Sequence, residues 1–270
     1  MRLTHPKRLY RLVTNLFCLC ICLWLGACTA APFTGRSRLI LIGEGEETAL
    51  GLKSYRKIMS ESKLSRDEKL VSQVRSVGLR IAGAADRPDF VWEFNVVEDD
   101  KTANAFCLPG GKVAVYTGIL PVAKNGDGLA AIMGHEIAHA IARHGAERMA
   151  QQKLVQIGTL AAGVAVSDMD PGMRRGVMGA LGVGAQFGVL LPFSRDHESE
   201  ADYMGILYAA RACYDPREAP QVWVRMGEAS GGGRQPAEFM STHPSHETRI
   251  KQLNEWMPKA LAERPSTCAN

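Results

Sequence analysis

Beyond its first 27 residues, the chain has no excess of charge. It contains 32 basic and 28 acidic residues, and four cations lie in that first segment: Arg2, Lys7, Arg8 and Arg11. The remainder therefore has 28 residues of each sign and a formal charge of zero. A protein that binds nucleic acid needs a basic surface. The composition predicts no nucleic-acid partner.

The chain also lacks a run of apolar residues long enough for a membrane span. Residues 152–193 are apolar and rich in glycine and alanine, but a join containing Arg174 and Arg175 interrupts them. Each apolar half has about 15–18 residues, whereas a spanning helix needs about 20. This pattern favours two short helices packed near the functional site, acting as a mobile cover, over two membrane spans.

The first 27 residues have the layout of a secretory signal, because a positive start precedes an apolar core from Leu12 to Leu25. The core ends in Leu25-Gly-Ala-Cys28, which resembles a bacterial lipobox. That resemblance implies that Cys28 becomes a lipidated first residue. Thr29 then implies sorting to the outer membrane, with the protein facing the periplasm. An ordinary cleaved signal and an uncleaved anchor are the alternatives.

Few cysteines remain after this segment. With Cys28 lipidated, Cys107, Cys213 and Cys268 are left in an oxidising compartment. Three thiols allow at most one internal disulfide, and we predict Cys213 with Cys268, which would tie the C-terminal tail to a helix end. Spacing does not determine connectivity, so other pairings stay open. Apolar neighbours make Cys107 a candidate buried thiol.

The strongest chemical signal is His135-Glu136-Ile-Ala-His139. Histidines four residues apart lie about 40° apart on one helix face, so both rings can reach one metal ion. Glu136 lies beside that face, where it can take a proton from water activated by the ion. A helix over residues 126–149 would place apolar residues behind the motif. Two ordinary histidines flanking a salt-bridging glutamate are the alternative.

A zinc ion held by two histidines needs a third protein ligand and leaves one position for water. Glu198 and Asp202 share a helix face in a later acidic segment, and small residues lie on the same stripe. Such a helix can pack closely against another. Glu198 would bind the metal, and Asp202 would orient a ligand or assist proton transfer. An acidic, solvated helix start is the alternative.

His144 is a weaker candidate. On a continuous helix it projects about 180° away from His135, onto the apolar side. The extended pattern that would supply a third histidine is absent, since Ala142 and Gly145 occupy its positions. We interpret His144 as structural.

Three motifs together resemble the HtpX/CAAX-protease family of zinc endopeptidases, of the gluzincin type, and within it the periplasmic lipoprotein branch. The resemblance covers residues 44–261, and this chain has Tyr203 where the family usually has arginine. The motifs occur in the family's order: Asn104–Gly111, His135-Glu136-x-x-His139 and Glu198-x-x-Ala201-Asp202.

The resemblance implies a role for each matching residue. His135, His139 and Glu198 would bind one Zn²⁺ ion. Glu136 would be the general base, and Asp202 would be a second catalytic or supporting group. These assignments apply only if the three segments meet in space.

The late sequence Thr-His243-Pro, followed by Arg249, resembles a family motif whose histidine lies near the zinc. His243 would stabilise the reaction intermediate or occupy the open coordination position of a resting enzyme. A loop or helix-capping histidine is equally consistent with the sequence. We interpret His197 and His246 as surface residues.

Alternating residues predict strands over 90–98 and 112–117. In zinc peptidases of this kind, the strand beside the site pairs with the substrate backbone, and residues 112–117 are the candidate. A plain core strand is the alternative.

The predicted fold is α+β and mainly helical, a zincin-like metallopeptidase domain with a small β-sheet beside the motif helix. The predicted organisation is a signal peptide (1–27), a lipidated cysteine and tether (28–43), the peptidase domain (44–262) and a tail (263–270). Further helices are expected over residues 44–62, 65–84, 215–228 and 245–261, with a flexible loop over 230–236.

These features predict a lipid-anchored zinc endopeptidase whose substrates are proteins or peptides. Misfolded or stalled envelope proteins are the substrates that the resemblance implies. The rival is a zinc-stabilised chaperone or assembly factor for outer-membrane proteins, working with the assembly machinery, whose proteolysis is weak or latent. A structural lipoprotein without metal is a third alternative.

Overall fold

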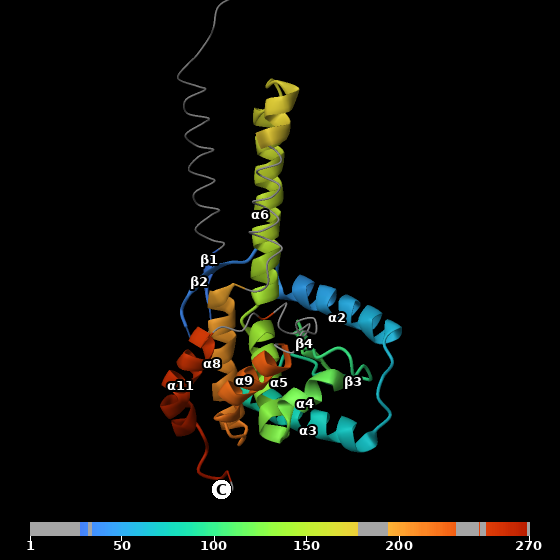
Figure 1. Cartoon of the computed structure of the whole chain (residues 1–270), viewed down its shortest axis with the longest axis vertical. Coiled ribbons are helices and arrows are strands. Elements are labelled where there is room, and N and C mark those ends of the chain that lie inside the picture. Colours follow the sequence, from blue (N-terminus) through green and yellow to red (C-terminus); the bar gives the residue numbers. More distant parts are fainter. Residues whose placement is uncertain (1–27, 32–33, 178–193, 231–242, 244–246, 269–270) are drawn as a thin grey trace, which may run out of the picture.

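The computed structural model describes residues 28–31, 34–177, 194–230, 243 and 247–268 (Figure 1). The predicted α+β, mainly helical class is confirmed. The principal elements are β1 (Cys28–Ala30), β2 (Ser37–Leu39), α2 (Glu44–Glu61), α3 (Glu68–Ala85), β3 (Glu93–Val97), β4 (Ala105–Leu108), β5 (Lys112–Tyr116), α4 (Leu120–Ala123), α5 (Gly126–Ile141), α6 (His144–Ala165), α8 (Arg195–Arg211), α9 (Glu218–Ser230) and α11 (Glu247–Ala262).

The further helices predicted from sequence are present as α2, α3, α9 and α11. The predicted signal peptide and His246 lie outside the described residues, as does all but the first residue of the predicted loop over 230–236.

Helix α5 carries the histidine motif and is buried along most of its length. Asn125 caps its start, where the side-chain oxygen accepts a hydrogen bond from the Gly128 amide at 2.8 Å. Every residue from Gly128 to Ile141 is buried. A helix that is buried all round lies in the centre of its domain, so the motif is held within the core.

Helix α5 ends earlier than predicted. Arg143 has a left-handed backbone conformation, with φ of 59°, which interrupts a right-handed helix. A new helix, α6, therefore begins at His144. The Arg143 side chain donates to the carboxylate of Glu47 at 2.6 Å. The prediction of one helix over 126–149 was wrong because this partner is distant in sequence.

Helices α5 and α8 approach each other backbone to backbone. A Cβ atom on Gly134 would lie 2.9 Å from the carbonyl oxygen of Gly205. A Cβ atom on Gly205 would lie 2.9 Å from the amide nitrogen of His135. The small residues predicted to line α8 therefore form its contact surface, and the close approach brings the α8 carboxylates to the α5 histidines.

The sheet has the strand order β3-β5-β4. Strand β5 is parallel to β3 and antiparallel to β4, with Val113 opposite both Phe94 and Cys107. Both edges of β5 are thus occupied, and the prediction that residues 112–117 pair with substrate was wrong. Strand β4 packs beside α5 and, among the described strands, pairs on one side only.

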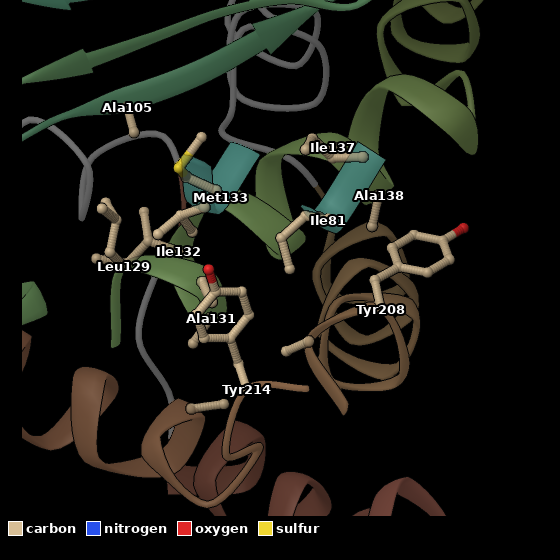
Figure 2. Close-up of a cluster of buried hydrophobic side chains, with 14 of the residues drawn as sticks. Ile81, Ala105, Leu129, Ala131, Ile132, Met133, Ile137, Ala138, Tyr208 and Tyr214 are labelled. Carbon is tan, nitrogen blue, oxygen red and sulfur yellow. The ribbon is translucent and has the colours of Figure 1, made fainter. Parts of the chain in front are cut away.

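Apolar side chains of α3, the sheet, α5 and α8 form one continuous core. Figure 2 shows Ile137 of α5 near Ile81 of α3, and Ala138 near Tyr208 of α8. All four side chains are completely buried. The motif helix is therefore packed on more than one side and has little freedom to move its ligands.

Helix α6 projects from the body (Figure 1). Its exposed part includes Leu160, 72% exposed, and Val164, 74% exposed. The prediction that the start of the 152–193 segment packs near the site was wrong, and residues 178–193 lie outside the description. No helix in the described ranges is both long and apolar enough to cross a membrane. The buried residues of α6 all lie near its start: His144, Ala146, Glu147 and Ala150.

The three cysteines beyond residue 28 have the predicted states. Cys213 and Cys268 form a disulfide, which ties the end of the described chain to the end of α8. Cys107 is a buried free thiol on β4. The cross-link restricts the unfolded chain across 55 residues.

Replacing Gly205 by alanine should lower the free energy of unfolding by about 1–3 kcal/mol, because the new methyl group meets α5 backbone atoms. Gly158 is the matched control, since an added Cβ there meets nothing within 4 Å. Gly158→Ala should leave stability unchanged or raise it. Urea denaturation measures both, and a Gly205→Ala protein as stable as the wild type would contradict the close helix contact.

Candidate metal centre

Four side chains capable of binding a metal meet at one point. They are His135 and His139 from α5, Glu198 from α8, and His243. All four are buried, and one ligand atom of each lies within 4.8 Å of the others. The structure thus brings together the three predicted ligands and the histidine predicted to lie near them.

The distances between these atoms match those around one tetrahedral ion. His135 Nε2 lies 3.0 Å from His139 Nε2, and the Glu198 carboxylate oxygens lie 3.3 Å and 3.4 Å from these nitrogens. Two atoms bound tetrahedrally to zinc at about 2.0–2.1 Å are about 3.3 Å apart. His243 Nδ1 lies 3.3 Å from His135 Nε2 and 3.0 Å from Glu198 Oε1, and it completes a set of four.

Glu136 lies beside this cluster with an unsatisfied carboxylate oxygen. Its Oε1 atom is buried and has no hydrogen-bond partner among the described residues. His243 Nε2 lies 3.6 Å from this oxygen. Burial raises the pKa of Glu136, which suits a group that takes up a proton and returns it. A buried unpaired acceptor is costly unless another molecule satisfies it, so this oxygen fits a site that receives water or substrate.

Asp202 supports His135 from the side opposite the cluster. Its Oδ1 atom lies 2.9 Å from His135 Nδ1, while Nε2 of the same ring faces Glu198. Arg249 donates to both Asp202 oxygens, at 2.6 Å and 2.7 Å, and its Nη1 lies 2.7 Å from Glu198 Oε2. Of the two roles predicted for Asp202, this geometry matches the orientation of a ligand.

The surroundings of the cluster favour a cation. Burial alone would raise the pKa of Glu198, but its contacts with the imidazoles of His139, His135 and His243 outweigh this effect and hold that pKa well below its usual value. Burial lowers the pKa of His139, which keeps this ring neutral, as a metal ligand must be. Burial also opposes protonation of His135, but hydrogen bonds to Asp202 and Glu198 raise its pKa to about 9. A metal ion would take the place of that proton.

The polar residues behind His139 were not predicted from the sequence. Because α6 starts in a new direction, His144 Nδ1 lies 2.8 Å from His139 Nδ1 and does not project to the apolar side. Burial lowers the pKa of His144 to about 4, so this ring is neutral. His197, predicted on the surface, is 1% exposed and lies 3.0 Å from the Glu147 carboxylate. Both corrections follow from the helix break, for which the sequence gives no clear sign.

The fold and site define a metallopeptidase of the His-Glu-x-x-His type. Residues 68–257 match the sequence profile of peptidase family M48. The chain belongs to this family and is a metalloendopeptidase.

Curated relatives come from mitochondria and from bacteria. The chain is 37% identical to the mitochondrial metalloendopeptidase OMA1 of Schizosaccharomyces pombe, over 87% of this chain and 68% of that protein. It is 32% identical to the Saccharomyces cerevisiae protein of the same name, over 85% of this chain and 69% of that protein. It is 28% identical to the beta-barrel assembly-enhancing protease of Escherichia coli, over 81% of this chain and 45% of that protein.

His243→Ala should leave the metal content unchanged and raise the rate of casein cleavage. In a tetrahedral site, Nδ1 of His243 would occupy the fourth position. Its hydrogen bond to the charged Glu198, which contributes about 1.5 kcal/mol, holds the ring there. Its removal should raise the rate about tenfold. A lower rate with metal retained would instead assign His243 to stabilisation of the reaction intermediate.

Proposed function

We propose that the metal is zinc and that the chain is an endopeptidase of the bacterial cell envelope that degrades misfolded or stalled envelope proteins. Three imidazoles and one carboxylate, whose ligand atoms lie within 4.8 Å of one another, form a donor set that suits zinc. The observation that carries the proposal is the unpaired Oε1 of Glu136 beside those donors.

When bound, zinc supplies a Lewis acid that polarises the scissile carbonyl and lowers the pKa of water. Glu136 takes the proton from the attacking water and delivers it to the leaving amine. Its raised pKa brings the carboxyl group closer to the pH at which both transfers are efficient. Asp202 and Arg249 keep His135 oriented during these transfers.

The substrate backbone would add to the edge of β4. This strand packs beside α5 and contains Cys107, whose pKa is raised by burial and by the nearby carboxylate of Glu136. A peptide along this edge therefore passes close to the proposed base. Backbone pairing tolerates many side chains, which suits an enzyme that acts on misfolded proteins.

The cellular location rests on the start of the sequence. Leu25-Gly-Ala-Cys28 supports a lipid anchor, and Thr29 supports the outer membrane. The bacterial relatives are named for the assembly of beta-barrels, which agrees with a role in the envelope. The reference to assembly in that name also favours the second candidate function, an assembly factor for outer-membrane proteins.

Glu136→Gln should keep the zinc content of the wild type and reduce casein cleavage by about 10²–10⁴-fold, because the amide cannot accept the proton. Glu228→Gln, an exposed change on α9, is the control and should cleave at the wild-type rate. Removal of the metal with a chelator should abolish cleavage, and added zinc should restore it. If Glu136→Gln complements a deletion strain fully, the assembly factor is the correct function.

Cys28→Ser should release the protein from the membrane fraction, since the thiol that would carry the lipid is lost. Mass spectrometry of the wild-type N-terminal peptide should show an acylated Cys28. An unmodified N-terminus at another residue would contradict the proposed anchor but leave the peptidase assignment intact.

A further inference from the structure

A chain of hydrogen bonds runs from the metal centre to the N-terminal segment, which here means β1, β2 and the residues that connect them. His139 Nδ1 lies 2.8 Å from His144 Nδ1, and His144 Nε2 lies 3.1 Å from Glu200 Oε2. Arg36 then donates to Glu200 through Nε at 3.2 Å and Nη2 at 3.0 Å. Thr34 also donates to Glu200. Four side chains thus separate the metal position from the β1–β2 connection.

The hydrogen bonds can be assigned in only one direction. The Glu200 carboxylate is an acceptor, so the His144 hydrogen is on Nε2. The other nitrogen of a neutral His144 ring accepts, and the hydrogen of His139 is therefore on Nδ1. This leaves a lone pair on His139 Nε2, the atom that faces Glu198. The chain selects the tautomer of His139 that can bind a metal.

Arg36 holds together two buried carboxylates that would otherwise repel each other. Its Nη1 and Nη2 atoms both donate to Glu147 at 2.8 Å, in addition to the bonds to Glu200. Glu147 is 5% exposed and Glu200 is 3% exposed. His197 contacts Glu147 and stacks on His144, with ring centroids 4.4 Å apart. Loss of the guanidinium would leave both acids without their shared cation and free Glu200 to shift away from His144.

The two metal-binding histidines therefore have matching support. His135 is held by Asp202, and that carboxylate is held by Arg249. His139 is held through His144 by Glu200, and that carboxylate is held by Arg36. The first arginine comes from α11 at the end of the chain, and the second comes from the N-terminal segment.

We propose that Arg36 is a positioning residue of the metal centre, which fixes His139 through Glu200 and His144 and makes metal affinity depend on the N-terminal segment. The proposal rests on the proposed function only in one respect, which is that the cluster of three histidines and Glu198 binds a metal. Replacing the support of a metal-binding histidine typically lowers metal affinity by about 10–100-fold.

The test measures zinc affinity of the full chain by competition with a chromophoric chelator, together with the visible spectrum of the Co²⁺-loaded protein. Arg36→Met should weaken zinc binding by about 10–100-fold and alter the Co²⁺ spectrum. Arg225→Met is the matched control, because Arg225 also pairs with a glutamate and is 22% exposed, against 25% for Arg36. The control should bind zinc as the wild type does.

A double-mutant cycle tests the route. In a His144→Phe background, Arg36→Met should cost little further affinity, because the connection is already broken. Additive losses would show that Arg36 acts elsewhere and would overturn the proposal. Arg36→Lys keeps the charge but not the forked geometry, so it should fold and show an intermediate loss if Arg36→Met fails to fold.

The outcomes separate the two proposals. If the wild type binds no zinc, the proposed function fails. If the wild type binds zinc and Arg36→Met or Arg36→Lys binds it equally well, the proposed function stands and the positioning role of Arg36 is wrong. Equal losses in the Arg36 and Arg225 variants would also contradict it.

Discussion

The metal centre depends on the backbone contact between Gly134 and Gly205. No side chain separates α5 from α8 at this point, so the two helices lie as close as their main chains allow. The next residue after Gly134 is His135, and Glu198 lies two turns before Gly205 on α8. A short carboxylate side chain can reach the imidazoles only because of this approach.

The buried charges around the site compensate one another. Glu198 and Asp202 face one arginine, and Glu147 and Glu200 face another. An isolated carboxylate would lose several kcal/mol on burial, and a forked guanidinium offsets this cost through charge and several hydrogen bonds. Among the described residues Glu136 has no arginine paired with it, and of these five acids it alone has a pKa that burial raises above its usual value. The four acids that support the site are thus paired with arginines, whereas Glu136 has a carboxylate oxygen that can accept a proton.

Local spacing was enough to predict α2, α3, α9, α11 and the histidine motif on α5, and together with the family resemblance it singled out the acids on α8. Glu198 and Asp202 were recognisable because their helix period and small neighbours are properties of one short segment. The break at Arg143 was not, since a left-handed residue stabilised by Glu47 depends on a contact across about 100 positions of sequence. The errors at His144 and His197 follow from that break. The choice of β5 as the substrate strand failed for a similar reason, because strand order is decided by long-range pairing and not by alternation.

The same break gives the molecule a long arm. Helix α6 has 22 residues, which corresponds to about 33 Å, and only its first two turns are buried in the body. The first residue of α6 is three residues beyond the end of α5. A tilt of about 5° at this first residue would therefore move the far end of α6 by about 3 Å. A force on the far end of α6 would therefore act on its buried start, where His144 and Glu147 lie.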